Sequence, residues 1–490
     1  MLLLFFLQNN NNMTIQDLEP KILWRNFADL NAVPRPSGDE ARVCQFIKDF
    51  AKNHHLDFIE DKVGNIIVRK PASKGMESKP TLVMQAHLDM VHEANSDTKK
   101  DFNTEGIDMV IDGDLVHAKG TTLGADNGIG VAAIMAYLAS TDLAHPALEA
   151  LFTIDEERGL TGALNLERGL LTGKRLLNLD TEEDHVFSIG CAGGIDTVIE
   201  WTYHASAAPS QTVGIQVFVK ELCGGHSGMD IHKGLGNAHK LLNRVLMHCQ
   251  AAGIYIGTWT GGGKRNAIPR ESKVVIAVKS LKKFEKLFKT IQKDILTEYA
   301  TLEPNMVIDF ETTALPEKVM AHKEVKKLLL AIRSTHNGVF RMSPDIVGLV
   351  ETSSNLATIE LADGHARFGT LQRSAIESGK MEVADAVSAP FELIGAKINR
   401  FGSYPGWKPN PKSPLLQKMV ELYEKMFSEK PVVEACHAGL ECGIIGSHYP
   451  KMDMISFGPN IWGAHSPTER VSISSVQKFW EFLNKVVKEL

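Results

Sequence analysis

The sequence predicts an α/β protein in which a mostly parallel sheet is interrupted by an inserted α+β domain. Short apolar runs such as "NIIVRK", "TLVMQAH" and "KRLLNLD" alternate with helical patterns in the first part of the chain. The same alternation returns near the C-terminus, with a helix in "SPLLQKMVELYEKMF" and a strand in "MDMISFGP". Between these parts the strands are longer and have a period-two pattern, as in "TVGIQVFVKEL". We therefore expect the two outer parts to form one domain around the insertion.

Length and composition support two domains and exclude several function classes. The chain has 490 residues, 43% of them hydrophobic, which exceeds the usual size of one domain. We predict a catalytic domain from residues 13–197 and 405–490, with residues 198–404 inserted. The net charge is -6, and the absence of a basic stripe argues against nucleic-acid binding. The six cysteines form no CxxC pair, which favours a reducing, cytoplasmic location.

The N-terminal stretch "MLLLFFLQNNNNM" is not expected to associate with a membrane. It lacks a positive n-region and a small-residue cleavage site, and its apolar run is too short to span a bilayer. We interpret residues 1–12 as a disordered tail or as an extension upstream of a start at Met13.

Local signals predict several individual elements. In "SGDE", Ser37 is expected to cap a helix and Glu40 to return the bond. The turn "ADG" at residues 362–364 predicts a hairpin. The inserted domain contains two amphipathic helical patterns, "GLGNAHKLLNRVLMHC" and "KKFEKLFKTIQKDILTEY", and the lysines of the second are interpreted as a solvated face.

Side chains that can bind metals follow the ends of several apolar strands: His87 and Asp89 after "TLVMQA", Glu156 and Glu157 in "LFTIDEERG", Asp180 in "RLLNLD", and His465 in "GPNIWGAHSP". In open α/β sheets the carboxyl ends of the strands form the ligand crevice, so these side chains are expected to converge. Taken singly, each could be a polar strand end or a helix cap. Histidines and carboxylates together form a set that zinc accepts.

Three further expectations concern the geometry of this set. Asp126 in "GTTLGADNGIG" follows glycines that allow a sharp turn before a helix, although it could be only a helix cap. Asp89 lies two residues after His87, so on a strand it would point to the same side and hold the imidazole. Neighbouring acids leaving a strand point in different directions, and one carboxylate must stay unligated to accept a proton.

A series of motifs in the same order resembles the di-zinc metallopeptidases, and within them the aminoacyl-histidine (Xaa-His or beta-alanyl-histidine) dipeptidases. The resemblance extends from about Thr14 to the C-terminus. It is carried by "AHLDMV", "GTTLGADNGIG", "TIDEERG", "NLDTEE", "GCAGGID", "GGHSG", "GLGNAHKLL", "RNAIPRE", "HAGLECG" and "GPNIWGAHSP".

The resemblance implies roles for the residues of the metal set. His87 and Asp180 would bind one zinc ion, Glu157 and His465 the other, and Asp126 would bridge both. Glu156 would be the general base, and Asp89 would support His87. Asp155 receives no role, and a cis peptide bond is expected between Asp126 and Asn127. Cobalt or manganese could replace zinc.

The resemblance also implies that the insertion is a lid that contributes to substrate binding. His226 would polarise the scissile carbonyl, and Asn266 and Arg373 would hold the substrate carboxylate. His437 and Gly439 would line the pocket, whereas Glu441 is interpreted as structural. Without the resemblance, Arg373 would be read as an ordinary surface arginine.

We therefore expect a cytoplasmic di-zinc dipeptidase that hydrolyses small peptides with a free C-terminus, of the Xaa-His type such as beta-alanyl-histidine. Related activities that share the zinc ligands are a tripeptidase and an N-acyl amino acid deacylase. A non-catalytic metal-binding protein is less favoured, because it would not need the unligated acid. The oligomeric state, including a homodimer, is left open.

Overall fold

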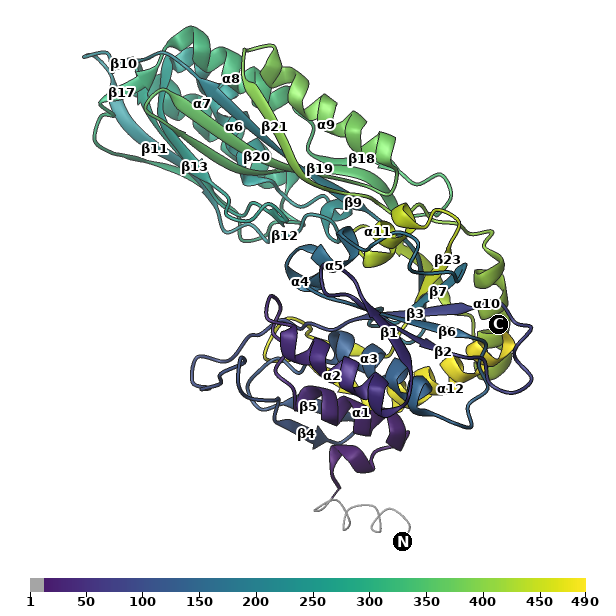
Figure 1. Cartoon of the computed structure of the whole chain (residues 1–490). Coiled ribbons are helices and arrows are strands. Elements are labelled where there is room, and N and C mark those ends of the chain that lie inside the picture. Colours follow the sequence, from purple (N-terminus) through teal and green to yellow (C-terminus); the bar gives the residue numbers. More distant parts are fainter. Residues whose placement is uncertain (1–12) are drawn as a thin grey trace. The chain divides into compact units, whose positions relative to one another are not determined.

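The computed structural model describes residues 13–490 and divides into two compact units (Figure 1). The first unit comprises the chain up to Gly190 together with Pro409–Ala435 and Glu441–Leu490. The second comprises Cys191–Lys408 and Cys436–Leu440. The interpretation of residues 1–12 lies outside the described residues. None of the helices between residues 13 and 490 is both long and apolar enough to cross a membrane.

The first unit is built on an eight-stranded sheet of order β1-β2-β6-β3-β7-β23-β8-β22. Its centre is parallel, because β3 pairs with β6 and β7, and β23 pairs with β7, all in parallel register. The mostly parallel core predicted from the sequence is thus confirmed. The strands are β1 (Asp57–Glu60), β2 (Ile66–Lys70), β3 (Leu82–His87), β6 (Leu148–Thr153), β7 (Arg175–Asn178), β8 (Val186–Cys191), β22 (Val432–Cys436) and β23 (Asp453–Ser456).

Helices cover this sheet and bury its central strands. Every residue of β3 and β6 is buried, which is typical of strands that are covered on both faces. Helix α3 packs against β3 and is itself covered by α1. The main helices of the unit are α1 (Lys21–Asn31), α2 (Ala41–Asn53), α3 (Ala125–Ala139), α10 (Pro414–Phe427) and α12 (Ile473–Glu489). A small sheet of β4 (Met109–Asp112), β5 (Leu115–Ala118), β24 (Ile461–Trp462) and β25 (Arg470–Ser472) completes it.

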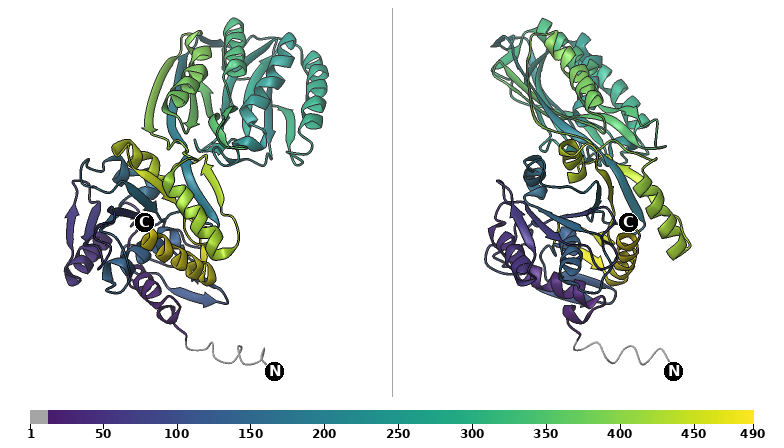
Figure 2. Two further views of the ribbon diagram at one scale, coloured as in Figure 1. Left: turned by 90° about the vertical axis from the view of Figure 1, so that its right-hand side faces the viewer. Right: turned by 45° about the vertical axis from the view of Figure 1, so that its right-hand side comes forward.

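The second unit has a long antiparallel sheet of order β16-β11-β15-β13-β19-β20-β9-β21, with β18 paired to β19. Helices lie against one face of it (Figure 2). The strands are β9 (Gly193–Thr202), β11 (Val213–Lys220), β13 (Ile254–Gly261), β15 (Ser272–Val278), β16 (Val307–Thr312), β18 (Gly338–Met342), β19 (Val350–Ala362), β20 (His365–Ser374) and β21 (Lys397–Tyr404). The helices are α6 (Ala238–Cys249), α7 (Leu281–Glu298), α8 (His322–Ser334) and α9 (Glu377–Glu392).

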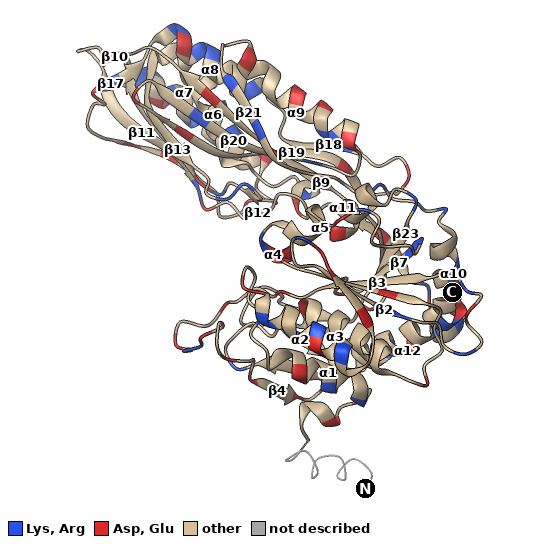
Figure 3. Ribbon diagram, in the orientation of Figure 1, with Lys and Arg blue, Asp and Glu red and all other residues tan. Residues whose placement is uncertain are grey.

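Two local predictions in the second unit are confirmed. Strands β19 and β20 pair from Ala362 and His365 onward, and the turn residues Asp363 and Gly364 have φ of 47° and 89°. Positive φ at both positions is typical of a tight two-residue hairpin. In α7 the side chains Phe284 and Phe288 are buried while its lysines are exposed. Basic and acidic residues are interspersed over both units (Figure 3).

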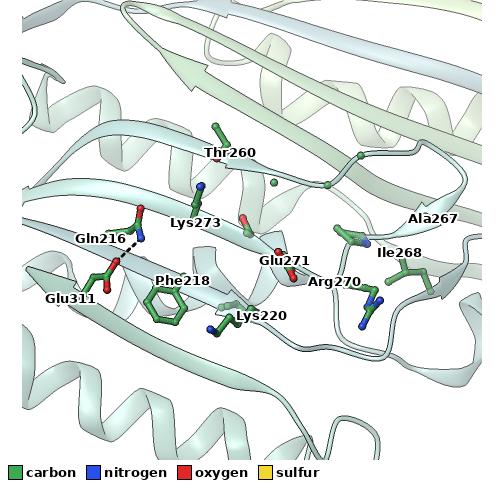
Figure 4. Close-up of a pocket in the computed structure, with 16 residues that line it drawn as sticks. Gln216, Phe218, Lys220, Thr260, Ala267, Ile268, Arg270, Glu271, Lys273 and Glu311 are labelled. Atoms are coloured by element: carbon green, nitrogen blue, oxygen red, sulfur yellow. Dashed lines mark hydrogen bonds between the residues drawn. The ribbon is translucent and has the colours of Figure 1, made fainter. Parts of the chain in front are cut away.

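The sheet face opposite the helices carries a hollow of about 640 Å³ (Figure 4). On β11, Val217 belongs to the core under the helices, so its neighbours Gln216 and Phe218 face the other way into the hollow. Gln216 Nε2 donates to Glu311 Oε1 across it, 2.9 Å away. The hollow contains no cluster of metal-binding or nucleophilic side chains, so it is not the preferred candidate for an active site.

The predicted helix cap at Ser37 is wrong. Helix α2 begins at Ala41, its N-cap residue is Glu40, and no side chain caps it. The Ser37 hydroxyl instead donates to Asp89 Oδ2, 2.8 Å away. A buried carboxylate requires hydrogen-bond donors, and this tertiary demand outweighs the local capping preference.

Candidate active site

The predicted metal-binding side chains converge at one edge of the central sheet. His87 is the last residue of β3, the acids Glu156 and Glu157 follow β6, and Asp180 follows β7. Because these three strands are parallel neighbours, their carboxyl ends meet at the same edge. His465 reaches this edge from the loop between β24 and β25.

Asp126 is shared between two pairs of side chains. His87 Nε2 lies 3.0 Å from Asp126 Oδ1 and 3.3 Å from Asp180 Oδ1. His465 Nε2 lies 3.1 Å from Asp126 Oδ2 and 2.9 Å from Glu157 Oε2. Each oxygen of Asp126 therefore faces a different histidine, and each histidine faces one further carboxylate. The geometry offers two adjoining sets of imidazole and carboxylate donors that meet at one carboxylate.

The electrostatics of this cluster fit divalent cations. Hydrogen bonds to the carboxylates of Asp126 and Glu157 raise the pKa of His465 to about 11. Burial by itself would lower the pKa of His87, but nearby carboxylates raise it well above its ordinary value. Burial raises the pKa of Glu157, whose Oε1 atom is buried without a hydrogen-bond partner. The carboxylates thus require more positive charge than two imidazoles provide, and imidazole with carboxylate is a donor set that zinc accepts.

Asp89 connects His87 to the segment that bears the acid pair. Its carboxylate accepts from the backbone N–H groups of Glu156 and Glu157, 3.0 Å and 3.2 Å away. His87 Nδ1 lies 3.1 Å from the Asp89 carbonyl oxygen and 3.5 Å from Oδ1. This leaves Nε2 of His87 directed at Asp126 and Asp180. Strand β3 ends at His87, so the contact arises from the turn after the strand and not from the expected strand alternation.

The three adjacent acids diverge because a short helix begins there. The chain leaves β6 at Thr153, and α4 (Glu156–Gly159) follows Asp155, which has φ of 49°. The expectation that strand alternation separates these side chains is therefore wrong. Asp155 Oδ1 pairs with Arg158 Nε at 2.9 Å, and Glu157 turns to His465.

The Glu156 carboxylate differs from its neighbours in its hydrogen bonding. No side chain or backbone group of residues 13–490 donates a hydrogen bond to it, and burial raises its pKa well above the ordinary value. Such a group favours the protonated form more than an exposed glutamate does. Glu157, by contrast, faces His465.

Two residues that sequence reasoning missed hold the turn before Asp126. Glu469 accepts from four successive N–H groups, those of Leu123 (2.7 Å), Gly124 (2.9 Å), Ala125 (2.7 Å) and Asp126 (3.3 Å). Arg35 is buried and donates to the carbonyl oxygens of Gly124 and Asp89, 2.5 Å and 3.2 Å away.

Part of this turn could be anticipated from the sequence. The only available signal for Glu469 was its position four residues after His465, and Arg35 had none. Gly124 has φ of 71°, consistent with the expected sharp turn. The expected cis peptide bond between Asp126 and Asn127 is present.

In the second unit, His226 presents a defined hydrogen-bond donor. It lies on β12 (Gly225–His226), which pairs with β14 (Ala267–Ile268). Its Nδ1 atom accepts from the N–H groups of Gly228 (3.2 Å) and Met229 (3.1 Å). The neutral ring must therefore carry its proton on Nε2. Burial, with a further contribution from Arg373, lowers the pKa of His226 and favours this neutral form. Asn266 lies beside it, since its carbonyl accepts from Ser227 N at 2.8 Å.

Arg373 is buried, contrary to the reading of a surface arginine, with 5% of its surface exposed. Its Nη1 donates to the Tyr404 hydroxyl at 3.1 Å, and its Nε finds no hydrogen-bond partner among residues 13–490. His437 Nε2 lies 2.7 Å from Ser353 Oγ, and burial together with Arg373 lowers its pKa to about 3. At Gly439 a Cβ atom would lie 3.2 Å from the Tyr404 ring.

Glu441 is fully buried in the first unit. It accepts from Gln85 Nε2 (2.6 Å) and Thr153 Oγ1 (2.7 Å), which agrees with the interpretation of a structural residue. Burial raises its pKa to about 7.

The central sheet thus carries, at its carboxyl edge, two adjoining sets of imidazole and carboxylate groups of the kind that metal-dependent hydrolases use. Residues 83–489 match Peptidase family M20/M25/M40, and the chain belongs to this family. The chain is 40% identical to the cytosol non-specific dipeptidase of Escherichia coli (strain K12), over 97% of this chain and 99% of that protein.

Solved structures agree with this assignment. The crystal structure of aminoacylhistidine dipeptidase from Vibrio alginolyticus has a TM-score of 0.92 and 41% identity, and the match covers 98% of each chain. Aminopeptidase PepT from Bacillus cereus shares the fold, with a TM-score of 0.56 and 15% identity over 96% of this chain and 99% of that chain. The predictions of fold class, of the peptidase family and of a peptide-bond hydrolase are confirmed.

Proposed function

We propose that this protein is a cytoplasmic metallo-dipeptidase that hydrolyses dipeptides with a free C-terminus, including Xaa-His dipeptides such as beta-alanyl-histidine. The observation that carries the proposal is the shared carboxylate of Asp126, whose two oxygens face His87 and His465 separately. The names of the two similar proteins support the substrate class, since one is a cytosol non-specific dipeptidase and the other an aminoacylhistidine dipeptidase.

The same geometry supports an assignment of the metal-binding residues. His87 and Asp180 would hold one ion, Glu157 and His465 the other, and Asp126 would bridge them. We propose two zinc ions, with cobalt or manganese as substitutes. When bound, such ions act as Lewis acids on a peptide carbonyl and make a water molecule more acidic.

Glu156 transfers the proton, and Asp89 orients His87 and the start of α4. The Glu156 carboxylate, which receives no hydrogen bond from the described residues, accepts a proton from the attacking water. It then passes that proton to the leaving amine. Asp89 holds the imidazole of His87 through Nδ1 and fixes the first N–H groups of α4.

Residues of the second unit bind the substrate. The Nε2–H group of His226 donates to the carbonyl oxygen as negative charge develops on it. Arg373 and Asn266 bind the free carboxylate, and His437 and Gly439 line the pocket. A buried guanidinium without a carboxylate partner among residues 13–490 supports this assignment, because charge-assisted pairing with a carboxylate would satisfy it.

A hydrolysis panel tests the proposal. It compares free dipeptides, their C-terminally amidated analogues, tripeptides and N-acyl amino acids, with metal content measured on the same protein. Free dipeptides, Xaa-His among them, should be the best substrates. Faster turnover of tripeptides or N-acyl amino acids would favour those related activities. Bound metal without any turnover would favour a non-catalytic protein.

The carboxylate contact is tested by Arg373→Ala. This variant should lower kcat/KM for free dipeptides by about 10- to 100-fold. It should then hydrolyse free dipeptides and their amidated analogues with similar kcat/KM. The control is Arg367→Ala, because Arg367 lies on the same strand but is exposed. An Arg373→Ala variant that keeps the full preference for a free carboxylate would refute the assignment.

A further inference from the structure

We propose that Tyr404 is the positioning residue for Arg373 and thereby sets the preference for substrates with a free carboxylate. This inference rests on the proposed function and extends it to a residue that the motifs did not single out. It is carried by a three-strand arrangement within the second unit, in which Arg373, Gly194 and Tyr404 lie side by side.

Strand β9 separates the two side chains that touch. In the sheet register Gly194 on β9 pairs with Arg373 on β20 and with Tyr404 on β21. The phenol must therefore cross β9 to reach the guanidinium. A Cβ atom at Gly194 would lie 2.7 Å from the Cε1, Cζ and hydroxyl oxygen of Tyr404, closer than side-chain atoms approach one another. The absence of a side chain at this position opens the path for the ring.

The Tyr404 ring is also held from other sides. The buried Lys380 donates from Nζ to the Tyr404 carbonyl oxygen at 2.8 Å and to Ser403 Oγ at 3.0 Å. A Cβ at Gly439 would lie 3.2 Å from the ring. The backbone of Tyr404 is thus fixed by a buried cation, and its ring lies between two glycines. The hydroxyl group has little freedom other than the position beside Arg373.

A neutral acceptor orients Arg373 without cancelling its charge. The Tyr404 hydroxyl is the one hydrogen-bond acceptor that residues 13–490 offer to this guanidinium, and none of their carboxylates forms an ion pair with it. Asp196, whose carboxylate interacts electrostatically with Arg373, already pairs with Arg265. A buried charge without an ion partner is costly, and a ligand carboxylate would relieve that cost. An Asp or Glu in place of Tyr404 would satisfy the arginine permanently and leave no charge for the ligand.

The decisive variant is Tyr404→Phe, which removes the hydroxyl and keeps the ring. With a free dipeptide, KM should rise by about 10-fold while kcat changes little, because binding of the carboxylate is impaired and the chemistry is not. With the amidated analogue both constants should stay at their wild-type values. Gly194→Ala should act in the same direction, since it displaces the ring but keeps the hydroxyl. Tyr203→Phe is the matched control, because Tyr203 is a buried tyrosine of the same unit whose ring packs against Trp201.

A double-mutant cycle separates positioning from an independent structural effect. If the hydroxyl acts through Arg373, then Tyr404→Phe should cause no further loss in an Arg373→Ala background. Additive losses would overturn the inference. So would a Tyr404→Phe enzyme that keeps the wild-type preference while Arg373→Ala loses it, an outcome that leaves the proposed function intact. If the wild-type enzyme itself does not discriminate between free and amidated dipeptides, the proposed carboxylate recognition fails, and this inference fails with it.

Discussion

The two units place charge in the protein interior in opposite ways. In the first unit, Asp126, Asp180 and Glu157 crowd around two imidazoles, and an oxygen of Glu157 is buried without a partner. In the second unit, the Arg373 guanidinium is buried and its hydrogen-bond partner is an uncharged phenol. Burying an uncompensated charge is unfavourable, so each arrangement favours a ligand of opposite sign. This contrast is the reason for proposing a cation site in the first unit and an anion site in the second.

The variant with the largest predicted loss of activity tests whether one residue of the acid cluster is not a metal ligand. Glu156→Gln should keep its metal and its stability but lose about 100- to 10,000-fold in turnover, because the side chain can no longer accept a proton. Mass-spectrometric metal analysis beside steady-state kinetics on a Xaa-His dipeptide measures both quantities.

The neighbouring acids provide the controls for this experiment. Glu157→Gln should lose or weaken one metal site, because Glu157 faces His465 at 2.9 Å. Asp155→Asn should be the mildest of the three changes, since Asp155 pairs with Arg158. A metal-depleted Glu156→Gln beside a metal-replete Glu157→Gln would reverse the two assignments.

The second effect tests whether the anion-binding unit also takes part in the chemistry. His226→Ala removes the Nε2–H donor and should lower kcat by about 100- to 1,000-fold, the usual cost of losing one donor to a developing oxyanion. Metal content should be unchanged, since His226 belongs to the second unit. The control is His232→Ala, an exposed histidine nearby in the sequence. A normal kcat in His226→Ala would restrict the second unit to binding.

A third experiment changes Glu469, the buried carboxylate of the first unit that accepts hydrogen bonds from backbone N–H groups. Glu469→Gln replaces one acceptor oxygen with an NH₂ group that faces backbone N–H donors. The variant should be destabilised by about 1–3 kcal/mol and should retain metal less well, because the turn before Asp126 is loosened. Thermal unfolding and dialysis against a chelator measure the two effects. Glu481→Gln, an exposed glutamate on α12, should behave as wild type.

An effect confined to acidic pH concerns the stability of the second unit. His239 is fully buried, and burial lowers its pKa from 6.5 to about 4. Its Nδ1 faces Ser272 Oγ at 2.9 Å and its Nε2 faces the Ala357 carbonyl at 3.2 Å, as a neutral ring requires. Because the folded pKa is depressed, the stabilising contribution is complete above pH 6.5 and is lost as the pH falls towards 4.

His239→Gln tests this pH dependence. The loss of stability on acidification should be shallower in the variant, by on the order of 3 kcal/mol over the whole range. Unfolding measured across this range in the presence of a chelator keeps metal release from adding to the difference. Equal slopes for the variant and the wild type would show that His239 does not titrate on unfolding.

Several strands of the central sheet, and the polar residues that gather at its edge, could be predicted from the sequence. Apolar runs predicted β3, β6, β7 and β23, and the polar residues after them predicted the edge where the ligands meet. The "ADG" hairpin and the turn at Gly124 were also readable, because positive φ angles are specified by local residue type. The conformation of these turns depends on residues that are adjacent in the sequence. The end of a strand can be recognised where an apolar run changes abruptly to polar residues.

The pairing of polar groups with their hydrogen-bond partners could not be predicted from the sequence. Ser37 donates a hydrogen bond to Asp89 and does not cap a helix. Glu469 accepts hydrogen bonds from a turn that lies more than 300 residues away in the sequence. The Tyr404 hydroxyl accepts from Arg373 across Gly194. The side chains of Glu156 and Glu157 point in different directions because a short helix begins at Glu156, and the three adjacent acids did not predict this helix. Buried polar groups take whichever donor or acceptor packing brings within reach, and that choice depends on contacts between segments remote from one another in the sequence.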